Sequence, residues 1–266
     1  MKKNIIIYLA CIVLIFSGIS CARSEPEGQT ENGQDQNGQT GADYEEGFYS
    51  IQEDEFDDHG WKPMVTVVVE GSRISKAFYD EINEENRLKS FDQDYLERWK
   101  DNSGENLLTA EPKLVDQLLS KQDPDKIDEV SGATSTSEKF KDLASGALTR
   151  QPGTQNDTGY YDGLQKAEGE YDERGWKAYV AAIVEEGNIQ SAYYDEVNEE
   201  SGKLKSYDDE YLANWKENSG TNLTEARASL IQDLIDKQDT DDIDTVSGAT
   251  STSTKFKELM KEALTP

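Results

Sequence analysis

Two copies of the octet Val-Ser-Gly-Ala-Thr-Ser-Thr-Ser are the segments of this chain best suited to chemistry. They occupy residues 130–137 and 246–253, and each stands just ahead of a helix-like stretch. A glycine followed by small residues leaves space around the threonine hydroxyl, and the first amides of a helix favour an anion. The octet could therefore hold a phosphate on or beside its threonine. It could equally be a turn in which Ser135, Thr136 or Ser137 caps the helix.

The cysteine and histidine content excludes several other kinds of site. The chain has two cysteines, Cys11 and Cys21, and one histidine, His59. The residues after Cys21 therefore offer no disulfide, no thiolate nucleophile and no cysteine-bound metal. One histidine cannot serve a Ser-His-Asp or Cys-His site in both copies. We expect no hydrolase chemistry, and we assign neither a catalytic residue nor a metal ligand.

The charge balance limits the possible partners. The formal net charge is −28, from 55 acidic and 27 basic residues. Nucleic-acid phosphates need neutralisation by Lys and Arg, and anionic lipid surfaces attract basic segments. We therefore expect neither nucleic acid nor electrostatic docking on anionic lipid. Such a surface suits a soluble, self-repelling protein.

The first 42 residues are expected to target and anchor the chain. Residues 1–20 join two lysines to a short apolar run and predict a signal peptide rather than a spanning helix. Gly18-Ile19-Ser20-Cys21 resembles a bacterial lipobox with Cys21 as the lipid attachment site, although Gly18 stands where Leu is usual. Residues 21–42 lack periodicity and predict a disordered tether. We expect a cell-membrane protein, lipid-anchored on the extracytoplasmic side; an ordinary signal peptide is the alternative.

Beyond the tether the chain contains one unit twice. The segment HGWKPMVTVVVEG aligns with RGWKAYVAAIVEE, and the alignment continues through both octets. The period is much longer than that of solenoid repeats, so each copy should form its own core. We predict a first domain at residues 43–148, a linker at 149–159 and a second domain at 160–266.

Each copy shows a strand hairpin followed by helices. Strands are expected at 64–69, 74–79, 180–184 and 189–194, with Glu70-Gly71-Ser72 as the first hairpin turn. Helices are expected at 90–100, 112–122 and 138–148, and again at 206–216, 228–238 and 254–264. Locally paired strands followed by helices indicate two tandem α+β domains, each with an antiparallel sheet.

The residues that lead into each threonine resemble a known motif. The pattern D-x-x-S-G-A-T is similar to the acceptor motif of the FMN-binding domain family, which includes the C subunit of the sodium-pumping NADH:quinone reductase and the G subunit of the Rnf complex. The matching positions are Asp128, Ser131, Gly132, Ala133 and Thr134, and Asp244, Ser247, Gly248, Ala249 and Thr250. The hairpin segment VTVVVEGSRI also resembles the family, and VAAIVEEGNI does so more loosely.

The resemblance implies a cofactor and roles for the motif residues. In that family FMN is joined by a phosphoester bond to the threonine that closes the motif, and a dedicated flavin transferase installs it. Thr134 and Thr250 would then be acceptors of two covalent FMN groups, with the other motif residues forming the cofactor-binding site. Asp128 and Asp244 would orient the loop or assist the transferase; a loop-capping aspartate is the alternative.

Other residues near the motif have two interpretations each. Lys139 and Lys255 could meet the phosphate, although solvated helix lysines are commoner. Four aromatic side chains could stack on the flavin ring but are more often core residues: Tyr79, Tyr194, Trp99 and Trp215.

Two such domains behind a lipid anchor are similar to flavin lipoproteins of extracellular electron transfer in Gram-positive bacteria. The resemblance implies a carrier rather than a stand-alone enzyme. It would take electrons from a membrane donor, such as a quinol or a membrane dehydrogenase, and pass them to external or periplasmic acceptors. A flavin transferase would be its maturation partner.

Two other function classes remain open. An acidic stretch precedes each octet, at 121–130 and 237–246, and could indicate a calcium- or ligand-binding surface lipoprotein. The EF-hand template fails there at three positions in each copy. The second class is a flavin reductase that acts directly on a soluble acceptor. Against it, the chain shows no Gly-rich dinucleotide fingerprint and no haem-attachment Cys-x-x-Cys-His.

Overall fold

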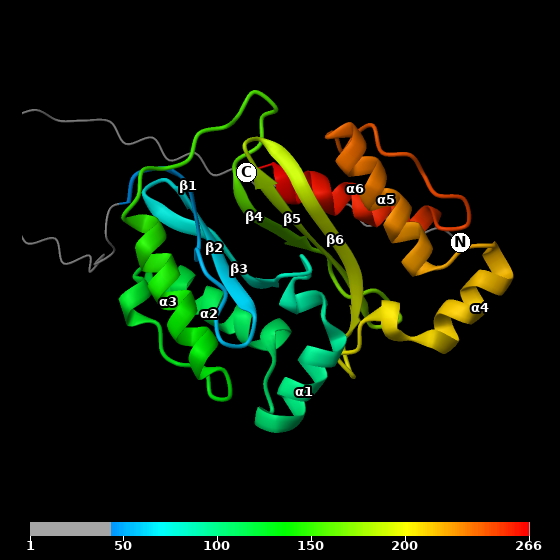
Figure 1. Cartoon of the computed structure of the whole chain (residues 1–266), viewed down its shortest axis with the longest axis horizontal. Coiled ribbons are helices and arrows are strands. Elements are labelled where there is room, and N and C mark those ends of the chain that lie inside the picture. The colour runs from blue at the N-terminus through cyan, green and yellow to red at the C-terminus, as the bar shows by residue number, and fades with distance from the viewer. Residues whose placement is uncertain (1–43, 266) are drawn as a thin grey trace, which may run out of the picture. The chain divides into compact units, whose positions relative to one another are not determined.

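The computed structural model describes residues 44–265, so the expected signal peptide, Cys21 and the tether lie outside the described residues. The first copy contains β1 (Gly47–Gln52), β2 (Trp61–Glu70), β3 (Arg73–Asn83), η1 (Lys89–Phe91), α1 (Gln93–Ser103), α2 (Leu107–Lys121), η2 (Pro124–Lys126) and α3 (Thr134–Leu148) (Figure 1). The second copy contains β4 (Gly163–Glu168), β5 (Trp176–Glu185), β6 (Asn188–Asn198), η3 (Lys205–Tyr207), α4 (Asp209–Ser219), α5 (Leu223–Lys237) and α6 (Thr250–Leu264). None of the helices in the described residues has the length and apolar character needed to cross a bilayer.

The strands form two separate antiparallel sheets. Their orders are β1-β2-β3 and β4-β5-β6, which confirms the predicted α+β class. The predicted hairpin is also confirmed: Glu70 pairs with Arg73 across Gly71 and Ser72, which both have positive φ. A two-residue loop of this kind matches the right-handed twist of the strands.

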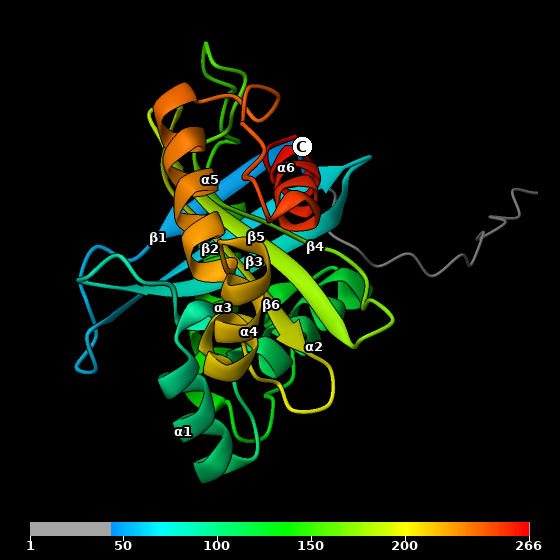
Figure 2. The ribbon, with the colours of Figure 1, turned by 90° about the vertical axis from the view of Figure 1, so that its right-hand side faces the viewer.

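Helices cover one face of each sheet. In the first copy α2 contacts β3, and α3 contacts β2 and β1; in the second copy α5 contacts β6, and α6 contacts β5 and β4 (Figures 1 and 2). Phe140 of α3 and Phe256 of α6 are fully buried in these interfaces. Burial of a phenylalanine stabilises the fold by about 1.5–3 kcal/mol.

Several predicted boundaries were wrong. The strands β1 and β4 were not predicted, because short segments such as GFYSIQ carry little alternation. The helix expected from residue 112 begins at Leu107, so Pro112 lies inside it. The structure tolerates Pro112 there because tertiary packing of Leu107, Leu114 and Leu118, all fully buried, stabilises the helix.

A glutamine side chain closes part of the free edge of each sheet. Gln122 accepts a hydrogen bond from Ile74 N at 2.8 Å and donates to Ile74 O at 2.9 Å, which imitates a neighbouring strand. Gln238 bonds to Ile189 in the same way, at 2.7 and 3.1 Å. Satisfied edge groups offer no template for pairing with another chain.

The second copy supplies a cation to the core of the first. Asp80 and Glu111 are buried, and Nζ of Lys166 on β4 pairs with Glu111 and lies 3.7 Å from Asp80 Oδ2. The same ammonium donates to Tyr79 O at 3.1 Å. Burial lowers the pKa of Lys166, but the attraction of Glu111 and Asp80 outweighs it and raises that pKa.

The second copy meets the same need with its own residue. Asp195, the counterpart of Asp80, pairs with Arg227 Nη1 at 2.7 Å. Arg227 occupies the position that Glu111 has in the first copy. The first copy therefore depends on the second for charge balance, whereas the second provides its own.

Replacing Lys166 with methionine should strongly destabilise the protein. Breaking a buried ion pair by removing one partner costs about 3–5 kcal/mol. Burial raises the pKa of Asp80 and of Glu111, and Lys166 opposes this rise. The contribution of these carboxyl groups to stability falls as pH rises above their unfolded pKa values of 3.8 and 4.5, and it falls further when Lys166 is absent. We therefore expect a larger loss at pH 7.5 than at pH 5, measured by urea unfolding.

The matched control is Lys177→Met. Lys177 pairs at 2.8 Å with Glu168, whose side chain is 59% exposed. Exposed pairs contribute about 0–1 kcal/mol. An equal loss of unfolding free energy in the Lys166→Met and Lys177→Met variants would contradict the role given to Lys166.

Candidate functional site

The candidate acceptor threonine of each octet is the first residue of a helix. The helices begin at Thr134 and Thr250, four residues before the predicted starts. Ala133 and Ala249 occupy the N-cap positions, and neither provides a side-chain cap. The capping interpretation of the octet was therefore wrong, since its later hydroxyl residues lie inside the helix. The first helical amides have no intrahelical partner, so the threonine stands where an anion is favoured.

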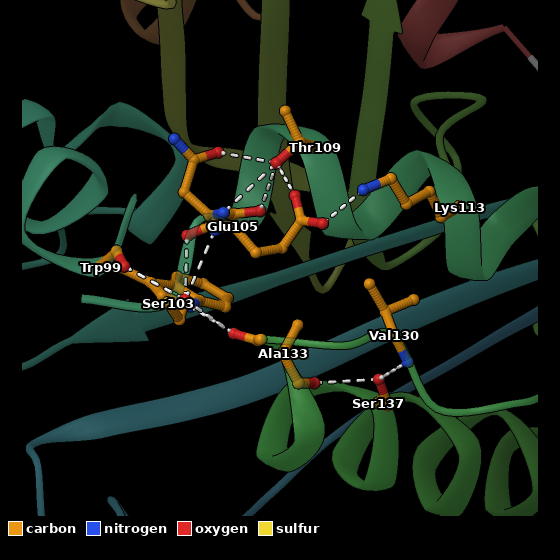
Figure 3. A network of polar contacts seen from close by, with 10 residues as sticks. Trp99, Ser103, Glu105, Thr109, Lys113, Val130, Ala133 and Ser137 are labelled. Atoms are coloured by element: carbon orange, nitrogen blue, oxygen red, sulfur yellow. Dashed lines mark hydrogen bonds and ion pairs between the residues drawn. The ribbon is translucent and has the colours of Figure 1, made fainter. Parts of the chain in front are cut away.

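Burial separates the hydroxyl groups of the octet into two sets. Ser131, Thr134 and Ser135 are exposed, whereas Thr136 and Ser137 are buried. Ser137 Oγ accepts from Val130 N at 3.0 Å and donates to Ala133 O at 2.9 Å, so it closes the loop on itself (Figure 3). Ser253 makes the same two bonds in the second copy. The exposed threonine thus follows a loop that is fixed from inside.

A glycine turns each octet tightly against the C-terminal end of α1 in the first copy and of α4 in the second. Gly132 and Gly248 have φ values of +83° and +79°. A Cβ on Gly132 would stand 2.8 Å from Ser103 O, and one on Gly248 would overlap Ser219 O. Only glycine combines this left-handed conformation with such close backbone contact.

A tryptophan from the same helix holds the carbonyl group of that glycine. Trp99 Nε1 donates to Gly132 O at 2.8 Å, and Trp215 Nε1 donates to Gly248 O at 3.0 Å. Figure 3 shows Trp99 and Ser103 of α1 beside the loop that leads to Ala133. Both tryptophans were candidates for stacking on a flavin ring; the structure gives them a hydrogen bond to the loop and partial packing against the core.

The aspartates of the motif lie on the outside of the loop. The side chain of Asp128 is 86% exposed and pairs with Lys121 at 2.6 Å, and that of Asp244 is 90% exposed and pairs with Lys237 at 3.0 Å. The hydrogen bond from Lys121 lowers the pKa of Asp128, which keeps it ionised. Each carboxylate therefore bonds to the helix before the octet and stays accessible to a partner.

Lys139 and Lys255 are partly exposed, and each bridges two carboxylates. Lys139 Nζ pairs with Asp57 at 2.6 Å and with the buried Glu81 at 2.9 Å. Burial raises the pKa of Asp57, but hydrogen bonds from Lys139 and from backbone amides outweigh it and bring that pKa to about 2. Lys255 pairs likewise with Asp172 and Glu196, at 3.4 and 3.2 Å.

The two candidate tyrosines belong to the core. Tyr79 and Tyr194 are at most 1% exposed, and their hydroxyls donate to Glu81 at 3.0 Å and Glu196 at 2.9 Å. Burial, followed by the neighbouring carboxylates, raises the pKa of both phenols. Stacking on a bound ring is therefore excluded in this conformation.

Sequence reasoning missed two residues beside the octet of the first copy. Thr134 Oγ1 donates to the carboxylate of Glu129, whereas the second copy has Thr245 at that position. Glu105 bonds to Thr109 and Lys113 and lies against Gly132 (Figure 3). Thr221 replaces it in the second copy. Glu129 stands at an unspecified position of the motif and Glu105 lies outside it, so no sequence signal marked them.

The acidic stretches before the octets make local contacts. Asp123 accepts from Asp125 N at 3.1 Å and pairs with Lys126 at 3.0 Å. Among residues 44–265, no three His, Cys, Asp or Glu side chains are grouped so as to hold a metal ion.

Comparisons with known proteins place both copies in one family. The model of the FMN-binding domain matches residues 60–149 and 175–265, and each match contains one octet. A 15 kDa lipoprotein of Treponema pallidum is 35% identical over 102 residues, which cover 38% of this chain and 72% of the relative.

Two solved structures also resemble single copies. A crystal structure of a Clostridium perfringens protein is 37% identical, with a TM-score of 0.39, over 40% of this chain and 87% of that protein. A solution structure of a Clostridium thermocellum protein is 30% identical, with a TM-score of 0.29, over 39% of this chain and 89% of that protein.

Replacing Gly248 with alanine should distort the second octet. A left-handed conformation costs a non-glycine residue about 1–2 kcal/mol, and the overlap of the new Cβ with Ser219 O adds about 1–3 kcal/mol. Thermal or urea unfolding measures the loss. Gly220→Ala is the matched control, because Gly220 has φ +78° and no atom within 4 Å of its Cβ position. Equal losses in the two variants would show that the close contact is unimportant.

Proposed function

Because the chain belongs to the FMN-binding domain family, we propose that it carries FMN as a phosphoester on both Thr134 and Thr250 and works as an electron carrier. The observation that carries this proposal is the position of these two threonines. In each copy the hydroxyl is exposed, begins a helix and follows a buried alanine that provides no side-chain cap.

The residues present fit a phosphate group. The amides of the first helical turn and the helix dipole favour negative charge at the point where the threonine stands. Small exposed neighbours, Ser131 and Ser135 in the first copy, leave the hydroxyl open to a second protein. The carboxylate of Glu129, which accepts the Thr134 hydroxyl, must turn away when the ester forms, because both groups are then anionic.

Formation of the ester requires an activated flavin donor. In the proposed step the Thr Oγ1–phosphorus bond forms while the pyrophosphate bond of flavin adenine dinucleotide breaks. AMP leaves, and the hydroxyl proton passes to a base of the flavin transferase. The exposed carboxylates of Asp128 and Asp244 are available to contact that enzyme.

When bound, FMN supplies reversible transfer of one or two electrons. The chain itself provides two attachment points, one in each copy, and no substrate site is needed for such a carrier. We propose a membrane donor, such as a quinol or a membrane dehydrogenase, and external or periplasmic acceptors.

The proposed location is the extracytoplasmic side of the cell membrane. The lipobox-like sequence that ends at Cys21 supports a lipid anchor there. The relative in Treponema pallidum is named a lipoprotein, and this supports the same assignment. Incorporation of a labelled fatty acid, lost in Cys21→Ala, tests it.

Flavin fluorescence of denatured protein tests the attachment sites. The chain is co-expressed with a flavin transferase, denatured and separated by electrophoresis. Because each copy has one acceptor, we expect the fluorescence to fall by about half in Thr134→Ala and in Thr250→Ala, and to vanish in the double variant.

Two variants of neighbouring exposed hydroxyls serve as controls. Ser135→Ala and Ser251→Ala should keep the full signal, since only the first helical residue is the proposed acceptor. A dark wild-type band, with a transferase that is active on another substrate, would rule out covalent attachment. Loss of signal in a serine variant would show that the serine, and not the neighbouring threonine, carries the ester.

A further inference from the structure

We infer that Trp99 and Trp215 are positioning residues for the attachment of FMN, each acting through the carbonyl group of the glycine two residues before the acceptor. The inference rests on the proposed attachment to Thr134 and Thr250. It concerns how the chain presents these hydroxyl groups to the transferase.

The indole N–H fixes one side of the turn that leads to the threonine. It donates to Gly132 O at 2.8 Å in the first copy and to Gly248 O at 3.0 Å in the second. In the first copy, Ser137 holds the other side through Val130 N and Ala133 O. The peptide group between Gly132 and Ala133 is thus held before the chain reaches Thr134.

The indole packs against neighbouring side chains of its own copy. Trp99 packs edge-on against Tyr95 with the ring centroids 6.3 Å apart, and Trp215 packs edge-on against Tyr211 with the centroids 6.0 Å apart. Both also pack against the core of their own copy. The donor is thus held by packing on the core, and the glycine turn takes its position from there.

A fixed turn matters because attachment is an enzyme-catalysed attack by the threonine oxygen. Such a reaction needs the threonine oxygen about 3–3.5 Å from the phosphorus atom and aligned with the bond that breaks. Loss of one hydrogen bond reduces the population of the competent conformation by about three- to tenfold. The rate of attachment at that threonine should fall by the same factor.

The two copies differ in a way that makes the inference specific. In the first copy the single hydroxyl hydrogen of Ser103 is shared between Gly132 O, at 3.0 Å, and Trp99 O, at 3.1 Å. In the second copy the corresponding Ser219 Oγ donates to Trp215 O, at 2.8 Å. The first turn therefore has a second, shared donor beside the indole, whereas the second turn relies on the indole.

The test measures attachment at both threonines of the same chain. The full-length protein, purified without flavin, is incubated with flavin transferase and flavin adenine dinucleotide, and mass spectrometry follows the peptides that contain Thr134 and Thr250. We expect Trp215→Phe to slow attachment at Thr250 about five- to tenfold while Thr134 is unaffected. Trp99→Phe should slow attachment at Thr134 only about two- to threefold, because Ser103 remains.

Variants of the two serines test the predicted difference. Adding Ser103→Ala to Trp99→Phe should increase the loss at Thr134 to about tenfold. Ser219→Ala should leave attachment at Thr250 unchanged. Trp176→Phe is the control for loss of an indole from the same copy. Lys205 Nζ lies 4.5 Å from the centroid of the Trp176 ring, and the hydrogen bond to Gly248 O comes from Trp215.

The outcomes separate this inference from the proposed function. No flavin on either threonine of the wild-type chain would contradict the proposed function itself. With normal wild-type attachment, an unchanged rate in Trp215→Phe would overturn the positioning role. An equal loss at both threonines, or the same loss in Trp176→Phe, would show a general effect on folding and would overturn it as well.

Discussion

The contact between a left-handed glycine and the C-terminal end of α1 or α4 is the constraint on which the candidate acceptor site depends. Gly132 and Gly248 approach the carbonyl groups of Ser103 and Ser219 so closely that a side chain cannot be accommodated. This approach directs the chain into a new helix without a side-chain cap. The threonine that follows is left exposed at the helix start, where backbone amides and the helix dipole favour a phosphate.

The two copies share this constraint but differ in their electrostatics. The first copy has Glu129 at the acceptor hydroxyl and takes a cation for its buried carboxyl groups from Lys166 of the second copy. The second copy has Thr245 and Arg227 at the corresponding positions. Duplication has thus conserved the acceptor turn while the surroundings have diverged. Two flavins attached to these turns would meet different charges, and they need not have equal properties.

Much of the fold was predictable because its signals are local. The hairpin at Glu70-Gly71-Ser72 and the apolar spacing of the helices follow from turn chemistry and side-chain periodicity. The strands β1 and β4 carry a weak local pattern and are stabilised by pairing with a distant strand. The start of the helix at Thr134 was predicted too late, because serine and threonine favour capping positions unless a preceding turn already fixes the helix start.

The motif indicated the candidate acceptor threonines but not the residues that hold them. Trp99 is 33 positions from Gly132, and nothing in the sequence distinguishes it from an aromatic residue that only packs in the core. The same reason hid Lys166, whose partners lie in the other copy. Such long-range contacts are specified by the tertiary structure, so periodicity and spacing carry no signal for them.

The most direct test of this account is mass spectrometry of the two octet peptides, from a chain matured with a flavin transferase. The account predicts that each peptide gains the mass of FMN less water, with fragmentation assigning the addition to Thr134 and to Thr250. Unmodified peptides, or an addition on a neighbouring serine, would contradict it.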